Sequence, residues 1–212
     1  MASGTLRVLV TNFKGGCGKT TIATNLAAAF AANGFSTGLA EVDRQKSSLA
    51  WLDLRNGHGP PIVPLDWRKE VGEAPSNLQR VVIDAPANLR MRHVDELIRA
   101  ADLVVVPVLA SIFDEGSTER FLAKLDELKP IRKGRTSIAL VANRLRRHSK
   151  AAQRLEAFLA RIGQPIAARL SDRAIYGELA VQGLSIFDVD GHLVRPVRDE
   201  WRPLLLAIED AA

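Results

Sequence analysis

The sequence predicts an α/β fold, in which a single domain holds a mostly parallel, twisted sheet with helices on both faces. Short apolar runs suited to strands alternate with helical patterns at least six times along the chain. A glycine-rich segment joins the first run to an alanine-rich helical pattern. The 212 residues are 47% hydrophobic, which is enough to bury a full core, so we expect one domain over residues 1–212.

The expected strands are apolar runs bounded by turn residues. They are Leu6 to Thr11, Thr37 to Val42, Val81 to Asp84, Leu103 to Val108, Ser137 to Ala142 and Ile166 to Leu170, with a weaker candidate near Ile62 to Pro64. The stretch from Gly57 to Pro64 is rich in glycine and proline, which indicates a surface connection rather than a domain linker.

The expected helices lie between these strands. The first runs from Lys19 to Asn33, and Gly34 ends it, as glycine commonly does at a helix C-terminus. The others are Ser48 to Arg55, Arg92 to Ala101, Glu115 to Leu128, Lys150 to Ile162, Arg173 to Gln182 and Arg198 to Glu209.

The segment from Lys14 to Thr21 has the composition and the position of a phosphate-binding loop. Its glycines allow backbone N–H groups to surround a polyphosphate, and the helix that follows presents its positive end to the same anion. In an ordinary loop of this kind Lys19 neutralises the β- and γ-phosphates and the Thr20 hydroxyl binds Mg²⁺. Phe13 replaces the first glycine of the usual pattern, so this is a variant with a second lysine. We expect ATP and Mg²⁺ as ligands, with nucleotide contacts from Gly15, Gly16, Cys17, Gly18, Lys19, Thr20 and Thr21.

The form Lys-Gly-Gly-x-Gly-Lys-Thr-Thr resembles the deviant Walker A motif of the ParA/MinD family of P-loop ATPases. In that family the first lysine reaches the nucleotide of the partner subunit in a face-to-face dimer. The resemblance therefore implies an ATP-dependent homodimer in which Lys14 acts in trans beside Lys19. It also implies weak, Mg²⁺-dependent ATP hydrolysis that a ParB-like protein or another cargo adaptor stimulates.

Two aspartates follow expected strands at the edge where a nucleotide would bind. Asp84 ends the run from Arg80 and has the form of a Walker B motif, so we expect it to hold Mg²⁺ directly or through water. Asp43 resembles the second aspartate of the family's Asp-x-Asp-Pro-Gln segment, which positions the attacking water, and it too could approach the metal. The alternative is that each aspartate merely caps the next helix.

This segment departs from the family pattern at two positions. Glu41 replaces the first aspartate, and Arg44 replaces the proline. Glu41 preserves the charge but adds a methylene, so the role of that first aspartate is in question here. Arg44 changes the backbone freedom of a loop that should sense the γ-phosphate.

The net charge of +5 and the pI of about 9.7 arise late in the chain. Twelve basic residues lie between Lys129 and Arg173, against only Glu156 and Asp172. Such a face can neutralise DNA phosphates without reading bases. The best candidates for DNA contacts are Arg146, Arg147, Lys150, Arg154 and Arg173. On charge alone a solvated basic surface is the alternative, whereas the resemblance favours nonspecific DNA, because DNA-positioning members coat the nucleoid.

The resemblance extends over essentially the whole chain. Asn143 follows a strand and resembles the asparagine that contacts adenine in many relatives, although it could simply end the strand. The segment from Asp172 to Asp188 resembles the tail of short ParA proteins. Because the chain begins almost at its first strand, we expect no N-terminal helix-turn-helix domain and no operator binding.

Several other classes of protein are disfavoured. The N-terminus lacks the pattern of a signal peptide, and no apolar run reaches the roughly 20 residues of a membrane span. The single cysteine, Cys17, excludes an internal disulfide and the cluster ligands of the nitrogenase iron protein. We therefore expect a cytoplasmic, nucleoid-associated protein with no membrane partner. Its cargo could be a plasmid, a chromosome region or a protein cluster.

Three alternative functions share the phosphate loop. A MinD-like membrane switch needs a basic and apolar C-terminal helix, but the segment from Trp201 to Ala212 ends acidic. A metabolic ligase such as dethiobiotin synthetase would not explain the basic region. A tyrosine autokinase usually has a terminal tyrosine cluster, and Tyr176 is the sole tyrosine here.

Overall fold

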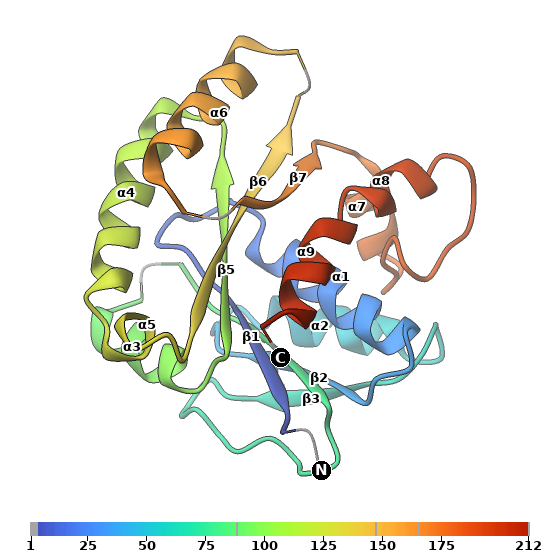
Figure 1. The fold of residues 1–212 in the computed structure, drawn as a ribbon. Coiled ribbons are helices and arrows are strands. Elements are labelled where there is room, and N and C mark those ends of the chain that lie inside the picture. Colours follow the sequence, from blue (N-terminus) through green and yellow to red (C-terminus); the bar gives the residue numbers. More distant parts are fainter. Residues whose placement is uncertain (1–3, 88, 147, 165, 212) are drawn as a thin grey trace.

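The computed structural model describes residues 4–87, 89–146, 148–164 and 166–211 (Figure 1). Within them, seven parallel strands form one twisted sheet in the order β3-β2-β4-β1-β5-β6-β7. The strands are β1 (Leu6–Val10), β2 (Thr37–Glu41), β3 (Ile62–Asp66), β4 (Arg80–Asp84), β5 (Leu103–Leu109), β6 (Ser137–Leu145) and β7 (Ile166–Ser171). The α/β prediction is thus confirmed, including the weaker strand.

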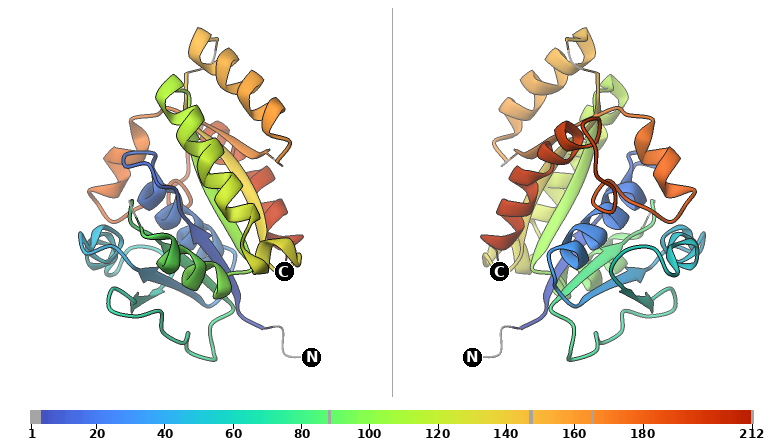
Figure 2. Two further views of the ribbon diagram at one scale, coloured as in Figure 1. Left: turned by 90° about the vertical axis from the view of Figure 1, so that its left-hand side faces the viewer. Right: turned by 90° about the vertical axis from the view of Figure 1, so that its right-hand side faces the viewer.

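Two helical layers cover the sheet, and side chains alternate between them. Val8 and Val10 of β1 pack in the cluster that includes α1, α2 and the C-terminal helices, whereas Leu9 packs toward α3, α4 and α6. The two side views separate these layers: α4 stands before the sheet in one, and α9 in the other (Figure 2). Because both faces are covered, β4 is buried along its whole length.

The helices mostly agree with the predicted ranges. They are α1 (Lys19–Ala32), α2 (Ser47–Arg55), α3 (Met91–Arg99), α4 (Ile112–Asp126), α5 (Lys129–Arg132), α6 (Lys150–Ile162), α7 (Ile175–Ala180), α8 (Arg195–Asp199) and α9 (Arg202–Glu209). The expected helix from Arg198 to Glu209 is wrong as one element. The helix is interrupted between Asp199, the end of α8, and Arg202, the start of α9. Pro203 lies in the first turn of α9, where its missing N–H is tolerated.

Two connections also differ from the prediction. The Gly57 to Pro64 connection ends early, because β3 begins at Ile62 and pairs with β2. Pro64 is tolerated there since β3 is an edge strand of the sheet. The helix expected from Arg173 begins only at Ile175, and a further short helix, α5, opens at Lys129 with Pro130 in its first turn.

The end of β6 is the correction that matters most for the site. The prediction ends this strand at Ala142, but it continues to Leu145 and so includes Asn143 and Arg144. The pairing between β6 and β7 shifts register between Ala142 and Leu145, and Arg144 has a φ of 53°. Bulges of this kind redirect side chains and are common beside functional sites.

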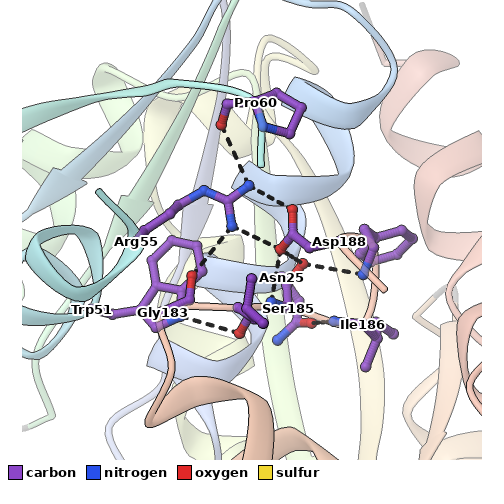
Figure 3. Close-up of polar contacts among 10 residues, drawn as sticks. Asn25, Trp51, Arg55, Pro60, Gly183, Ser185, Ile186 and Asp188 are labelled. Atoms are coloured by element: carbon purple, nitrogen blue, oxygen red, sulfur yellow. Dashed lines mark hydrogen bonds and ion pairs between the residues drawn. The ribbon is translucent and has the colours of Figure 1, made fainter. Parts of the chain in front are cut away.

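A buried ion pair joins α2 to the C-terminal segment (Figure 3). Arg55 donates hydrogen bonds from Nη1 and Nη2 to the two carboxylate oxygens of Asp188, at 2.7 and 2.6 Å. The side chains are only 4% and 1% exposed. Burial acts to raise the pKa of Asp188, but bonds from Arg55 and Ser185 outweigh it and keep the pKa below its usual value.

The same segment is attached to α1. The Asn25 side chain accepts a hydrogen bond from the Ile186 N–H at 3.2 Å (Figure 3). It also donates to the Thr21 carbonyl at 2.8 Å. Gly183 has a φ of 68°, and a Cβ at this position would overlap the backbone of α2 at Arg55. Segments about 130 residues apart in sequence, at Arg55 and Asp188, are therefore held together beside the first helix.

Replacing Asp188 by Asn should destabilise the protein by about 3–5 kcal/mol, because the Arg55 charge would remain buried without its partner. In Arg55→Met/Asp188→Asn the loss should be clearly smaller than the sum of the two single losses. Urea denaturation measures each value. Glu156→Gln is the matched control, since its pair with Arg169 is exposed and should change stability by less than about 1 kcal/mol. A loss for Asp188→Asn as small as that of the control would contradict the expectation.

Candidate functional site

The glycine-rich loop between β1 and α1 lies at the carboxyl edge of the sheet, with β4 and β5 on either side of β1. This is where ligands bind in parallel α/β sheets. Gly16 and Gly18 have φ angles of 74° and 91°, in the left-handed region that favours glycine. No side chain caps the N-terminus of α1, so its first N–H groups are suited to an anion.

Lys19 lies inside this loop and is only 8% exposed. Its Nζ donates to the Lys14 carbonyl at 2.8 Å and lies 3.8 Å from the Cys17 sulfur. A phosphate would offer this ammonium a charged and therefore stronger acceptor than the carbonyl. Lys14 is half-buried at the mouth of the loop. Burial raises the pKa of the Cys17 thiol against the opposing effect of Lys19, so Cys17 stays neutral and serves as packing.

Asn12 supports the loop from its N-terminal side, and it was missed by sequence reasoning. Its Nδ2 donates to the Pro107 carbonyl at 2.7 Å, and its Oδ1 accepts from the Lys14 N–H at 3.2 Å. Asn12 is 2% exposed. The contact with Pro107 joins residues 95 positions apart, so no local sequence pattern predicts it. The signal that could have pointed to Asn12 is its position two residues before Lys14.

Asp84 ends β4 beside the loop and is 1% exposed. Neither carboxylate oxygen has a hydrogen-bond partner of ordinary geometry among the described residues. Burial raises its pKa to about 7; nearby Glu41 and Asp43 add to this rise, whereas Thr20 and Lys19 oppose it. A buried, unpartnered carboxylate beside a threonine hydroxyl fits the ligand preference of Mg²⁺, so Asp84 and Thr20 could hold that ion.

Glu41 has a clear structural role in place of the family's first aspartate. It is fully buried, and its carboxylate accepts hydrogen bonds from the Asp43 N–H at 2.7 Å, the Ser48 N–H at 2.9 Å and the Ser48 hydroxyl at 2.8 Å. The extra methylene lets the carboxylate reach the first turn of α2, where a negative charge is favourable. Glu41 thus fixes the loop that carries Asp43.

Asp43 is half-buried and lies in the same cluster as Asp84, because it contributes to the raised pKa of that residue. Its Oδ1 accepts a hydrogen bond from the Gln45 N–H at 3.0 Å, which is a local turn contact and not a cap on α2. The next residues, Arg44, Gln45 and Lys46, are exposed. The structure therefore brings both predicted aspartates to the loop's β4 side.

On the other side of the loop lies a cavity of about 490 Å³, a size that suits a small ligand. Gly18, Thr21, Asn143, Arg144, Tyr176 and Trp201 contribute to its walls. Asn143 is 7% exposed, and its Nδ2 donates to the Cys17 carbonyl at 2.8 Å. Asn143 therefore fixes the loop and also lines this cavity.

The five predicted DNA-binding residues have different environments. Arg147 lies outside the described residues. Arg146 pairs with Asp172 at 3.1 Å, and Arg154 pairs with Glu115 of α4 at 2.7 Å. Lys150 and Arg173 are exposed, and the Nε of Arg173 donates to the Ser171 hydroxyl.

In the structure, the stretch from Lys129 to Arg173 is thus less purely basic than its sequence suggests, because acidic side chains from elsewhere pack against it. Besides Arg154, Arg161 meets a carboxylate of α4, Glu119, at 3.7 Å. Glu115 and Glu119 precede the stretch from Lys129 to Arg173, so a charge count over that stretch does not include them. Another exposed basic group, made of Lys129, Arg132, Lys133 and Arg135, lies at the opposite end of β6.

The last helix packs against the core. Leu204 and Ile208 of α9 are fully buried, and Glu209 pairs with Arg80 at 2.7 Å. Among the described residues, no helix combines the length and apolar character needed to cross a membrane. The apolar side of α9 is therefore occupied by the protein's own core.

Comparison with known proteins identifies relatives. The family model described as "CobQ/CobB/MinD/ParA nucleotide binding domain" matches residues 8–186. "Maintenance of carboxysome distribution protein A" of Halothiobacillus neapolitanus is 29% identical over 203 residues, which cover 92% of this chain and 93% of that protein.

Solved structures share the fold at lower identity. An ATP complex of a Cyanothece McdA variant superposes with a TM-score of 0.72 at 15% identity and covers 99% of this chain and 96% of the other. A putative plasmid partition protein of Borrelia burgdorferi bound to AMPPNP gives 0.74 at 14%, covering 96% and 99%. MinD of Pyrococcus furiosus gives 0.71 at 18%, covering 98% and 99%.

Replacing Asp84 by Asn should raise the stability of the metal-free protein at pH 8. In the native protein the Asp84 pKa of about 7 exceeds the ordinary 3.8, so between these two pH values the native carboxyl keeps its proton while the unfolded chain ionises, and at pH 8 the buried carboxyl has lost its proton as well. Its contribution is therefore fully present below about pH 4 and is lost as the pH rises to about 7, a difference of roughly 4 kcal/mol. Asn cannot ionise and removes this loss.

Urea denaturation in EDTA between pH 4 and pH 8 measures the difference between the variant and the wild type. The exposed Asp53 gives the control Asp53→Asn, which should follow the wild type at every pH. A constant difference between Asp84→Asn and the wild type across this range would show that Asp84 is already ionised in the native protein.

Proposed function

Because the chain belongs to the CobQ/CobB/MinD/ParA nucleotide-binding family, we propose that it is an ATP-driven positioning switch. ATP and Mg²⁺ join two subunits face to face, the dimer binds DNA without sequence preference, and slow hydrolysis releases it. The observation that carries this proposal is the loop from Lys14 to Thr21, which lies at the sheet edge beside the buried Asp84, a carboxylate with no hydrogen-bond partner of ordinary geometry among the described residues.

The site residues have distinct proposed roles. Lys19 neutralises the phosphates from within its own loop, and Lys14, at the mouth of that loop, serves the nucleotide of the partner subunit. The N–H groups of Gly15, Gly16, Cys17, Gly18 and Thr21 bind phosphate. Thr20 and Asp84 hold Mg²⁺, which when bound neutralises phosphate charge.

The acidic side of the site supplies the hydrolytic function. Asp43 would orient the attacking water, and its half-buried position near Asp84 is compatible with this role. The buried Glu41 holds the Asp43 N–H, so the backbone that carries this group is fixed before the nucleotide arrives. The weak activity that we propose would await a partner, such as a ParB-like protein or a cargo adaptor.

The proposed DNA surface lies beyond the carboxyl end of β6, on the nucleotide side of the molecule. Lys150 and Arg173 are exposed there, and Arg146 has only an exposed partner, Asp172, whose contribution to stability is small. DNA phosphates can therefore replace Asp172 at little cost. Arg154 is a weaker candidate because Glu115 already holds it through two hydrogen bonds.

We further propose that the cargo is a large protein assembly. The relative that matches 92% of this chain is named for carboxysome distribution. Of the four proteins compared above, it has the highest sequence identity to this chain. A plasmid or a chromosome region is the alternative cargo. Attachment to the nucleoid rather than to a membrane agrees with the packing of α9 against the core.

The proposed DNA binding is tested with a random-sequence duplex, with no nucleotide, ADP, or ATP plus Mg²⁺, across a salt series. We expect binding chiefly with ATP, weakening steeply as salt rises. Lys150→Glu/Arg173→Glu should reduce it by roughly tenfold or more, since like charges would face the phosphates. The control Arg132→Glu/Lys133→Glu makes the same charge change at the other end of β6 and should have a small effect. Binding independent of ATP, or equal losses in both variants, would count against this surface.

Replacing Lys19 and replacing Lys14 should affect different properties, namely ATP affinity and dimerisation. Lys19→Ala should lower ATP affinity by roughly two orders of magnitude, because the buried ammonium faces the phosphates. Lys14→Ala should keep ATP affinity within about threefold, since Lys14 contacts Lys19 through its backbone carbonyl, which alanine retains. It should, however, remain monomeric with ATP.

Nucleotide titration and light scattering measure these two properties. The exposed Lys69 provides the control Lys69→Ala, which should bind ATP and dimerise normally. An ATP-dependent dimer of Lys14→Ala would remove the role in trans.

A further inference from the structure

Arg144 reaches the phosphate loop from the end of β6, and its role is not explained by the fold. Its side chain is exposed, and Nη1 donates to the Gly16 carbonyl at 3.3 Å. Among the described residues, no carboxylate forms an ion pair with it. The Arg144 guanidinium thus contacts a loop suited to bind anions, and among the described residues its hydrogen bond there is a long one to a neutral carbonyl.

The backbone at Arg144 is held in a conformation that such a residue rarely adopts. Its φ of 53° lies in the left-handed region, and the pairing of β6 with β7 shifts register at this point. Strain of this kind persists where the surrounding structure enforces it, and it concentrates at ligand sites. Here the bulge turns Asn143 and Arg144 toward Cys17 and Gly16, so the strain is coupled to contact with the loop.

The position of Arg144 tells which part of a nucleotide it can reach. In the sheet, β4 and β6 lie on opposite sides of β1, and β5 separates β6 from it. Asp84 ends β4, so the proposed metal and the terminal phosphates belong to that side. Arg144 instead lines the 490 Å³ cavity together with Gly18, Thr21 and Tyr176. With the nucleoside in this cavity, the phosphate nearest to it would be the one within reach of Arg144.

We propose that Arg144 binds the α-phosphate of the nucleotide, exchanging the Gly16 carbonyl for a charged acceptor. A planar guanidinium matches phosphate geometry and can form two parallel hydrogen bonds. This inference rests on the proposed function, because it requires that the loop binds a nucleotide. It adds a third cation to Lys14 and Lys19, at the nucleoside end of the site.

Arg144→Ala should weaken ATP, ADP and AMP binding by a similar factor, roughly tenfold or more, because all three carry the α-phosphate. Arg144→Lys should recover part of the affinity. Arg144→Gly separates the charge from the backbone: glycine accepts the positive φ, so thermal stability should be maintained while affinity falls as in Arg144→Ala. Arg169→Ala is the control, since this exposed arginine of β7 pairs with Glu156 and should leave affinity unchanged.

Calorimetric titration of each nucleotide, together with a melting curve for each variant, gives the outcome. A loss confined to ATP would place Arg144 at the γ-phosphate or at the partner subunit and overturn the assignment. Normal affinity in Arg144→Gly would show that only the backbone matters, and affinity within twofold of wild type in Arg144→Ala would exclude any contact. A wild-type protein that binds none of the three nucleotides would instead refute the proposed function itself.

Discussion

The turn between β1 and α1 is the constraint on which the rest of the site depends. Gly18 has a left-handed backbone, and a Cβ at this position would overlap the Asn143 side chain, which holds the Cys17 carbonyl. Only glycine permits both this turn and this approach. Asn12 fixes the other end of the loop by joining the Lys14 N–H to the end of β5. The loop is therefore shaped by contacts with distant strands as much as by its own sequence.

Three carboxylates meet on the β4 side of this loop, and their surroundings differ in kind. Glu41 is buried but receives three hydrogen bonds, so its charge is stabilised within the protein. Asp84 is buried with no donor of ordinary geometry among the described residues, and its pKa rises to about 7, mainly because of burial. Asp43 is half-buried and retains contact with solvent. Of the three, Asp84 has the greatest need for a cation, and the other two carboxylates strengthen that need.

Local sequence patterns predicted what depends on local chemistry. The loop, the alternation of strands and helices, and the aspartates at strand ends all follow from residues close together in the chain. The structure confirms the sheet and places both aspartates beside the loop. What could not be predicted depends on distant partners: Glu115 neutralises Arg154 from 39 residues away, and the bulge that redirects Arg144 arises from pairing with β7. Charge counted along a sequence is thus a poor measure of charge on a surface.

The helix after the Asp43 loop is fixed at both of its ends. At its N-terminus the buried Glu41 holds the backbone and hydroxyl of Ser48, and at its C-terminus Arg55 is paired with the buried Asp188. Asp188 belongs to a segment that is itself bonded to Asn25 of α1 (Figure 3). This nine-residue helix is therefore held by buried polar contacts at both of its ends. Between β2 and this helix the exposed residues are Arg44, Gln45 and Lys46, so a change of backbone conformation beside the glycine-rich loop would break the fewest contacts there.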